Sequence, residues 1–239
     1  MKNDFHTHCL PGIDDGAPDI STALAMLRAA HKQGIRTVVA TPHFYAGEKT
    51  MDEFLTQRNA AASALRAAIA ADRELAGRIR LLLGAEVLVR EGVSELDLRP
   101  LCLEGTETIL LELPFMCPPS FLVDELEAIF FDQRLIPMMA HIDRYMPWYS
   151  RERIADLLDY PDLIVQLNAS SLADRRMFKH LTHWLPEDMR LVIGSDMHDM
   201  RERAPQMDAA IKQMSHHRVG REWLGRMEET GADVLERNA

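Results

Sequence analysis

Apolar residues along the chain follow two patterns, short runs that are almost entirely apolar and longer stretches in which apolar positions recur with helical spacing. The short runs are rich in β-branched and aliphatic residues, which is typical of buried strands. They predict seven strands, at residues 2–5, 36–41, 79–86, 108–113, 135–141, 163–168 and 190–195. The longer stretches predict helices between the strands, the clearest at 20–34, 51–76 and 118–133.

Strands that alternate evenly with helices favour a parallel α/β architecture. Because most of the strands are apolar throughout, both faces of the sheet are expected to be covered. No linker, low-complexity tract or shift in composition divides the chain, so we expect residues 1–239 to form a single domain. Both an open doubly wound sheet and a closed barrel fit this alternation.

Polar residues at the ends of the strands help to choose between the two folds. Each predicted strand ends at, or is followed by, a metal-binding residue or an amide: His6 and His8, His43, Glu86, Glu112, His141, Asn168, and Asp196 with His198. In a barrel these carboxyl ends meet at one rim, where barrel enzymes place their active sites, whereas an open sheet spreads them along an edge. The pattern therefore favours an α/β barrel.

The residue types at these strand ends predict a metal centre. Imidazoles and carboxylates without a thiolate are typical of Mn²⁺, Fe or Zn²⁺ sites rather than of Ca²⁺ sites. His6 and His8 are one residue apart and so share a face of an extended chain. With an aspartate from the opening loop, either Asp14 or Asp15, the set exceeds the needs of one ion. We expect two or three divalent ions, with Mn²⁺ as the first expectation and Fe or Zn²⁺ as alternatives.

Two arginines follow the expected ligands closely along the chain. Arg144 lies in "HIDRY" and Arg203 in "MRERAP". The forked donors of a guanidinium suit a phosphate group beside a metal centre, and we expect both arginines to bind phosphate. Five further histidines fall within helical stretches and are expected on solvated faces: His31, His180, His183, His216 and His217.

Composition and charge exclude several classes of protein. The formal charge is -10 and no run of Lys or Arg could follow a phosphate backbone, which argues against a nucleic-acid partner. No segment reaches the ~18 apolar residues needed to insert into a membrane. The chain also lacks the features of a signal peptide, so we expect a cytoplasmic protein. Cys9, Cys102 and Cys117 are too widely spaced for a disulfide framework, and we expect reduced, mostly buried thiols.

The order of the motifs H-x-H, P-H, G-x-E, E-x-P, H-x-x-R and S-D-x-H resembles the polymerase and histidinol phosphatase (PHP) superfamily. Within it, "HTHCLPGIDDGAPD", "VVATPHF", "LLELPF" and "SDMHDMRERAP" are similar to the bacterial metal-dependent protein-tyrosine phosphatases of capsule and exopolysaccharide operons. The similarity runs from Asp4 to the segment at 231–238.

This resemblance implies a distorted (β/α)7 barrel with a trinuclear centre. The implied ligand sets are His6, His8, Glu86 and Asp196 for one ion, Glu86, Glu112 and His141 for a second, and Asp15, His43 and His198 for a third. Arg144 and Arg203 match the phosphate-contacting arginines of the family. The implied reaction is hydrolysis by a metal-activated water, and the implied substrate is phosphotyrosine on a cognate bacterial tyrosine kinase.

One position departs from the family pattern. Members often have Pro-His-His in the second motif, whereas this chain has Phe44 after Pro-His. We expect Phe44 and Tyr45 to give the substrate rim a more apolar wall, extended by Phe115, Met116 and Phe121, unless these side chains merely pack a loop.

Three other functions fit parts of the pattern. Histidinol-phosphate hydrolysis uses a similar barrel and metals with a smaller site. A metal-dependent amidohydrolase normally has a lysine at the fourth strand end, where this chain has Glu112. A metal-stabilised regulatory module would bind metal without turnover. The sequence leaves open whether the protein is an oligomer.

Overall fold

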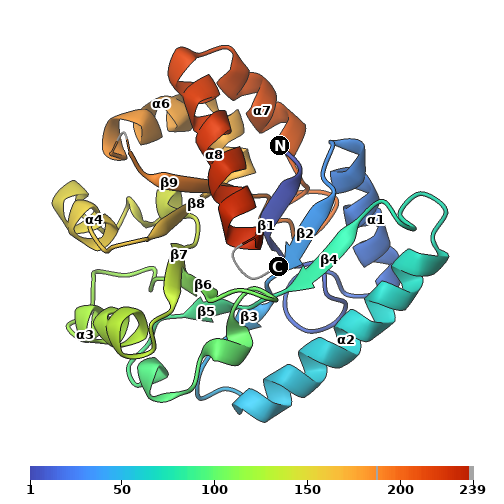
Figure 1. Cartoon of the computed structure of the whole chain (residues 1–239), viewed down its shortest axis with the longest axis horizontal. Coiled ribbons are helices and arrows are strands. Elements are labelled where there is room, and N and C mark those ends of the chain that lie inside the picture. The colour runs from blue at the N-terminus through green and yellow to red at the C-terminus, as the bar shows by residue number, and fades with distance from the viewer. Residues whose placement is uncertain (187, 237–239) are drawn as a thin grey trace.

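Two parallel β-sheets form the centre of the molecule (Figure 1), a computed structural model that describes residues 1–186 and 188–236. The smaller sheet has the strand order β1 (Asn3–Thr7), β2 (Thr37–Ala40) and β4 (Arg80–Leu83). The larger sheet has the order β3 (His43–Phe44), β5 (Glu86–Leu88), β6 (Thr108–Glu112), β7 (Ile136–Met139), β8 (Ile164–Asn168) and β9 (Arg190–Gly194). The last two residues of the segment 231–238 lie outside the described residues.

Each of the seven predicted runs contains a strand. Two segments, 37–44 and 80–88, are each broken into two strands, β2 and β3 or β4 and β5, and pass from the smaller sheet to the larger one. The first break follows Ala40, where Pro42 cannot donate a backbone hydrogen bond to a ladder. The second break, at Gly84, lies beside the first, since Gly84 N donates to Ala40 O at 2.9 Å. The pair β2–β4 therefore continues as the pair β3–β5, and the carboxyl ends of the two paths stay together.

The first and last strands also adjoin at their carboxyl ends. Asp196 N donates to His6 O at 2.8 Å, and His8 N donates to Met197 O at 3.0 Å. Thr7 forms an isolated parallel bridge with Met197. These links bring the segment after β9 against the end of β1, although the two strands belong to different sheets.

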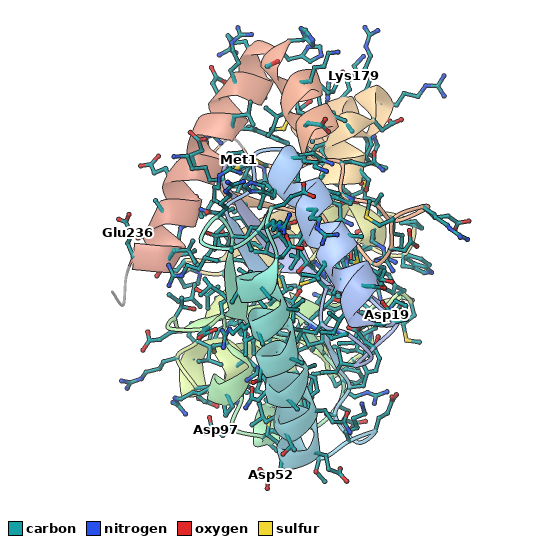
Figure 2. All side chains as sticks on the ribbon, turned by 90° about the vertical axis from the view of Figure 1, so that its right-hand side faces the viewer. Met1, Asp19, Asp52, Asp97, Lys179 and Glu236 are labelled. Atoms are coloured by element: carbon teal, nitrogen blue, oxygen red, sulfur yellow. The ribbon has the colours of Figure 1, made fainter. Side chains whose placement is uncertain are left out.

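Helices cover the outside of the sheets. They are α1 (Ile20–Lys32), α2 (Met51–Ala71), α3 (Leu122–Glu127), α4 (Arg151–Leu158), α5 (Ala169–Ala173), α6 (Arg175–Trp184), α7 (Met207–Ser215) and α8 (Arg218–Glu236). Figure 2 shows α1 and α2 side by side on one flank, beginning near Asp19 and Asp52 toward the same end of the molecule. No helix among the described residues is long and apolar enough to cross a bilayer.

Local side-chain chemistry sets the ends of the predicted helices. Asp19 accepts a hydrogen bond from Thr22 N at the start of α1, and Thr50 forms a reciprocal capping box with Glu53 at the start of α2. The prediction at 51–76 was too long, and the one at 118–133 began too early but ended close to the observed end, since α3 continues as a π-helical segment to Asp132. Asp72 accepts from the backbone N–H groups that follow it and ends α2 at Ala71. The third helix begins at Leu122, after the prolines rather than on them.

An apolar cluster joins strands of both sheets. Its fully or almost fully buried members are Phe5, Val39, Leu82, Leu103, Leu110, Met138, Ala140, Ile164, Val192 and Val234. In β6, Leu110 belongs to this cluster, and Glu112 follows two residues later on the same face of the strand. In β8, Gln166 and Asn168 follow Ile164 in the same way. The apolar cluster thus gives way to polar side chains toward the carboxyl ends of the strands.

Candidate metal centre and phosphate cavity

Nine metal-binding side chains, five imidazoles and four carboxylates, converge at the carboxyl ends of the strands. They are the nine predicted from the sequence. Within each of four overlapping groups, one ligand atom per residue lies within 4.8 Å of the others. The groups are His8, Asp15, His43 and His198; His6, His8 and Asp196; His6, Glu86 and His141; and His43, Glu86 and Glu112.

The innermost part of the cluster is formed by the first strand and the carboxylates facing it. The Nε2 atoms of His6 and His8 lie 3.1 Å apart. Glu86 Oε2 lies 3.2 Å from the first of these nitrogens and 3.3 Å from the second. Asp196 Oδ1 lies 3.6 Å from each of them. All four donors therefore face one small space.

Glu86 links this space to the rest of the cluster. Its Oε1 lies 2.7 Å from His141 Nε2, and its Oε2 lies 3.0 Å from His43 Nδ1. Glu112 Oε1 lies 3.4 Å from His141 Nε2. Because both carboxylate oxygens of Glu86 face imidazole nitrogens, this residue has the geometry of a bridging ligand.

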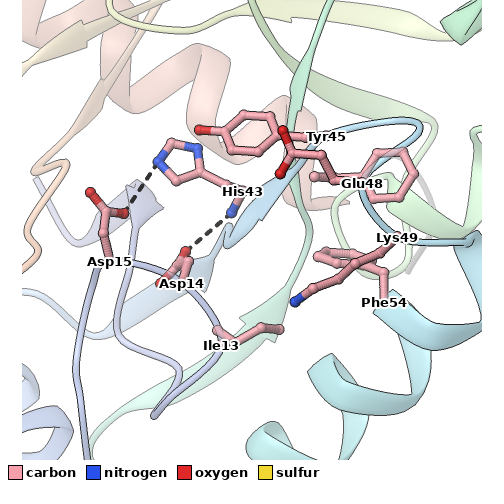
Figure 3. Close-up of a pocket in the computed structure, with 9 residues that line it drawn as sticks. Ile13, Asp14, Asp15, His43, Tyr45, Glu48, Lys49 and Phe54 are labelled. Atoms are coloured by element: carbon pink, nitrogen blue, oxygen red, sulfur yellow. Dashed lines mark hydrogen bonds and ion pairs between the residues drawn. The ribbon is translucent and has the colours of Figure 1, made fainter.

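The two aspartates of the opening loop have different positions. Asp15 Oδ1 lies 3.4 Å from His43 Nε2 and 3.3 Å from His198 Nε2, at the outer side of the cluster. Asp14 instead accepts from the outer nitrogen of His8, Nδ1, at 2.8 Å and from His43 N at 3.1 Å. Figure 3 shows Asp15 directed at the His43 ring and Asp14 directed at its backbone. Asp15 thus faces the outer imidazoles with the other candidate ligands, whereas Asp14 orients His8 through its outer nitrogen.

Gln166, a functional residue that the sequence analysis missed, lies beneath the cluster and is completely buried. Its Oε1 lies 2.9 Å from His6 Nδ1 and accepts from His141 N at 2.8 Å. Its Nε2 donates to Asn168 Oδ1 at 3.0 Å, and Asn168 Nδ2 donates to Asp196 Oδ2 at 3.1 Å. This amide chain holds ligands from three separate strand ends. The one signal in the sequence is a polar residue inside an otherwise apolar strand.

The backbone is strained at two of these ligands. His141 has φ +29° and Asp196 has φ +51°, which residues with a side chain seldom adopt. Close contacts fix the chain nearby as well. A Cβ on Gly194 would lie 2.5 Å from His6 Cβ, and one on Gly16 would lie 2.1 Å from His8 O. Both glycines let the backbone approach the ligands more closely than any other residue could.

Burial and charge shift the pKa values of these groups in opposite directions. Burial acts to lower the pKa of His8, but hydrogen bonds to Asp14 and Glu86 raise it to about 10. Burial acts to raise the pKa of Glu86, but the positive charge of His6 and hydrogen bonds from neighbouring imidazoles hold it well below its usual range. Burial and repulsion from His8 lower the pKa of His198 to about 4. Glu86 therefore stays ionised and attracts positive charge.

The donor set fits divalent cations. Four buried atoms in the cluster make no hydrogen bond of regular geometry among the described residues, although three of them lie close to a carboxylate oxygen or an imidazole nitrogen: His43 Nδ1, Glu86 Oε2, His141 Nδ1 and His198 Nε2. The outer nitrogens of His6 and His8 are held by Gln166 and Asp14, which leaves their Nε2 atoms facing the carboxylates. Imidazoles oriented by such partners, with ionised carboxylates and no thiolate, are typical of bound Mn²⁺, Fe or Zn²⁺.

Both predicted arginines lie beside the cluster. Arg203 Nη2 donates to Asp196 Oδ1 at 2.8 Å, and Arg144 Nη1 donates to Asp196 Oδ2 at 3.4 Å. The Arg144 guanidinium also lies over the ring of Phe115, 4.8 Å from its centroid. Their side chains are 41% and 36% exposed, so both can reach a ligand from solvent.

A cavity of about 410 Å³ opens over this side of the cluster. It is lined by Asp15, His43, Tyr45, Glu48, Leu88, Glu112, Pro114, Phe115, Met116, Arg144 and Arg203. The expected apolar wall is present in part, through Tyr45, Phe115 and Met116. Phe44 does not provide an exposed wall, because it is buried and packs edge-on against Phe54 at 5.0 Å. Its replacement of a histidine therefore changes the packing beneath the rim rather than the rim surface.

Predicted residues outside the cluster behave largely as expected. His180, His183 and His216 are exposed on helices away from the strand ends, while His31 and His217 are partly buried. All three cysteines are free; two are buried, and Cys117 is exposed.

Comparisons with known proteins agree with this geometry. The sequence profile of a family described as "Capsular polysaccharide synthesis, CpsB/CapC" matches residues 2–233. The tyrosine-protein phosphatase YwqE of Bacillus subtilis is 36% identical over 150 residues, which cover 59% of this chain and 54% of the relative. The tyrosine-protein phosphatase CpsB of Streptococcus pneumoniae is 26% identical over 224 residues, 87% of each chain.

Solved structures show the same fold. A crystal structure from work on YwqE and CpsB, described as metal-dependent tyrosine phosphatases, superposes with a TM-score of 0.79 at 24% identity over 99% of this chain and 95% of the other. A TatD-family hydrolase from Entamoeba histolytica superposes with a TM-score of 0.55 at 10% identity over 98% of this chain and 97% of the other. At these identities the likeness establishes the α/β fold alone.

Proposed function

Because this chain belongs to the CpsB/CapC family of capsular polysaccharide synthesis, we propose that it is a metal-dependent protein-tyrosine phosphatase. The observation that carries the proposal is the meeting of nine metal-binding side chains with Arg144 and Arg203 at one cavity. The names of the relatives, tyrosine-protein phosphatases that include YwqE and CpsB, support the same activity. We further propose that the phosphotyrosine lies on a bacterial tyrosine kinase that acts in capsule or exopolysaccharide synthesis.

We propose that the nine residues bind three divalent ions, Mn²⁺ first among them. One set is His6, His8, Glu86 and Asp196, a second is Glu86, Glu112 and His141, and a third is Asp15, His43 and His198, to which His8 lies close. Charge supports the number three. Four carboxylates and a phosphate dianion carry six negative charges, which three divalent ions balance. The strand-end contacts between β1 and Met197 also support a single distorted (β/α)7 barrel that holds the ligands at one rim.

Divalent ions bound here would lower the pKa of a water molecule and neutralise charge on the phosphoryl oxygens. The residues of the chain orient the reaction. Asp196 holds Arg144 and Arg203 against the cluster, so their remaining N–H donors are available to the phosphoryl oxygens. The leaving tyrosyl oxygen has a pKa of about 10 and needs less help from an acid than a serine oxygen does.

The test compares three phosphate monoesters. Metal-stripped protein, with and without added Mn²⁺, is assayed against a phosphotyrosine peptide, a phosphoserine peptide and histidinol phosphate. Turnover of phosphotyrosine that depends on metal, and that is lost in His141→Ala but kept in His183→Ala, is the expected result. The second variant is a matched control, since His183 is exposed and outside the cluster.

Other outcomes have distinct meanings. A preference for histidinol phosphate reassigns the substrate and keeps the metal centre. Bound metal with no turnover of any of the three compounds rejects a phosphatase and favours a regulatory module.

A further inference from the structure

The cavity beside the metal cluster has a polar side and an apolar side. Arg144, Arg203 and the outer ligands form the polar side. The apolar lining includes Tyr45, Leu88 and Phe115, together with Pro114 and Met116. Phosphate chemistry accounts for the first group of residues but not for the second, because an anion gains nothing from an aromatic wall.

The apolar residues come from three neighbouring chain paths. Tyr45 follows β3, Leu88 ends β5 and Phe115 follows β6, and these strands are adjacent in the larger sheet. Leu88 ends β5, the strand that lies between β3 and β6, so in strand order it falls between Tyr45 and Phe115. An aromatic ring that enters this side of the cavity meets apolar surface from all three.

The two aromatic rings are held parallel to ligand imidazoles. Tyr45 stacks on His43 with a centroid separation of 5.2 Å and an angle of 22°, as the rings in Figure 3 show. Phe115 stacks on His141 at 5.7 Å and 25°. Phe115 also contacts Trp148 at 5.6 Å on the protein surface. Each ring is partly exposed yet fixed in place, so it is available to a ligand without first being ordered.

We propose that Tyr45, Leu88 and Phe115 form a slot for the aromatic ring of an aryl phosphate and so select aryl over alkyl phosphate monoesters at this site. The inference rests on the proposed function, because it assumes that phosphate binds at the metal cluster. It adds the specificity determinant that the metal ligands and arginines do not supply, since these groups contact only the phosphoryl end of any monoester.

Binding of non-hydrolysable phosphonates tests the slot without relying on turnover. Metal-loaded protein is titrated by calorimetry with phenylphosphonate, methylphosphonate and inorganic phosphate. The wild type is expected to bind phenylphosphonate about tenfold more tightly than methylphosphonate, the order expected of one or two aromatic contacts. The ratio of the two affinities isolates the ring, because both ligands carry the same anionic group.

Two variants locate the contact. Phe115→Ala and Tyr45→Ala are each expected to bring the ratio close to one. Phe115 also packs against Arg144, and any effect through that arginine appears in the affinity for inorganic phosphate instead of in the ratio. Phe131→Ala is the matched control, because Phe131 is 55% exposed and does not line the cavity. It should leave all three affinities unchanged.

Equal binding of both phosphonates by the wild type overturns the proposal, as does no binding of phenylphosphonate or an unchanged ratio in both alanine variants. If either variant fails to fold, the wild-type ratio and the other variant still decide. Failure of the proposed function looks different. In that case the protein prefers phenylphosphonate but does not hydrolyse the phosphotyrosine peptide. This result supports the slot and rejects the phosphatase assignment.

Discussion

The apolar cluster within the sheets and the inner residues of the metal-ligand cluster at the strand ends are both buried, but they differ in what stabilises them. Ile164 and Leu110 are fully buried among other apolar side chains, and removing them from water is favourable in itself. Glu86 and His8 are 1% and 0% exposed, and their burial opposes the charge that each carries. Burial alone therefore does not show which part of a molecule makes it stable.

Along the same strands, the residues that stabilise the fold and the residues of the metal-ligand cluster therefore occupy different positions. The apolar cluster lies nearer the amino ends of the strands, and the metal-binding residues lie one to six residues further on. A change in one cluster can thus leave the other intact, and substitutions in the two should produce different signatures. Four predictions follow from this contrast, from the largest expected effect to the smallest.

Glu86→Gln should have the largest effect, and only on metal binding and activity. Glu86 faces imidazoles with both oxygens, and an amide cannot supply that charge. We expect hydrolysis of a phosphotyrosine peptide to fall by more than about 1,000-fold, or about 4 kcal/mol, and the rise in melting temperature on adding Mn²⁺ to disappear. A phosphotyrosine-peptide assay measures the loss of hydrolysis, and thermal unfolding with metal content after dialysis measures the loss of metal binding. A variant that keeps its full metal content contradicts the bridging role.

Met138→Ala should have the converse signature. Met138 is completely buried in the apolar cluster, and its truncation leaves a cavity. We expect the free energy of unfolding to fall by about 2–5 kcal/mol, equally with chelator and with Mn²⁺. Urea unfolding measures the change, and Met138→Leu, which keeps the volume, serves as the control. A loss confined to the metal-loaded protein would mean that the two clusters are coupled.

Gln166→Met should produce an intermediate effect that reaches the cluster indirectly. The change keeps the size of the side chain but removes the acceptor for His6 Nδ1 and for His141 N. We expect metal affinity, measured by competition with a chelator, to fall by about 10–100-fold. Gln166→Glu loses the donor to Asn168 and adds a negative charge, but it keeps the acceptor that faces His6 Nδ1, so it should lose less. Equal losses in both variants would exclude an orienting role for the amide oxygen.

Glu125→Gln should have the smallest effect, and it concerns a buried carboxylate that needs no cation. Glu125 accepts from Gly92 N at 2.6 Å and from Ser94 N at 2.8 Å. Burial acts to raise its pKa, but these hydrogen bonds lower it below the ordinary value of 4.5. Its contribution to stability is therefore present above pH 4.5 and lost as the pH falls through the lower folded value. We expect Glu125→Gln to cost about 1 kcal/mol at pH 7.

The test is how the loss of unfolding free energy caused by Glu125→Gln changes with pH. The difference in unfolding free energy between wild type and variant should shrink when urea titrations are repeated below pH 4.5. Glu127→Gln, at an exposed position on the same helix, should show little difference at any pH. A constant difference across the whole range would show that the charge of Glu125 contributes nothing.

Most of the strands and eight of the nine converging residues could be predicted from local signals in the sequence. The choice of Asp15 over Asp14 rested only on the resemblance of the motifs to a known family. A run such as "RLVIGS" marks a strand, and Asp196 and His198 mark the chemistry at its end. The breaks between β2 and β3 and between β4 and β5 were not predicted. Pro42 and Gly84 lie at these breaks, but neither residue alone shows that the chain passes to a second sheet, because that depends on how β2 and β4 pair and continue as β3 and β5.

The roles of Asp14 and Gln166 could not be derived from local pattern either. Asp14 and Asp15 are neighbours, and only the fold of the loop directs one toward His8 Nδ1 and the other toward the outer imidazoles. Gln166 acts on His6, which lies 160 residues earlier in the chain. Such contacts depend on which strands become neighbours, and single-sequence periodicity does not contain that information.

The loop at 113–121 has an evolutionary consequence. It joins β6 to α3 without belonging to either sheet, and it carries Phe115 and Met116 at the cavity while Glu112, the neighbouring ligand, stays inside the strand. Loops of this kind tolerate insertion and sequence drift because little of their backbone is tied into the core. Sequence change in this segment can therefore alter what the cavity accepts, alongside Tyr45 and Leu88, while Glu112 keeps its place in the strand.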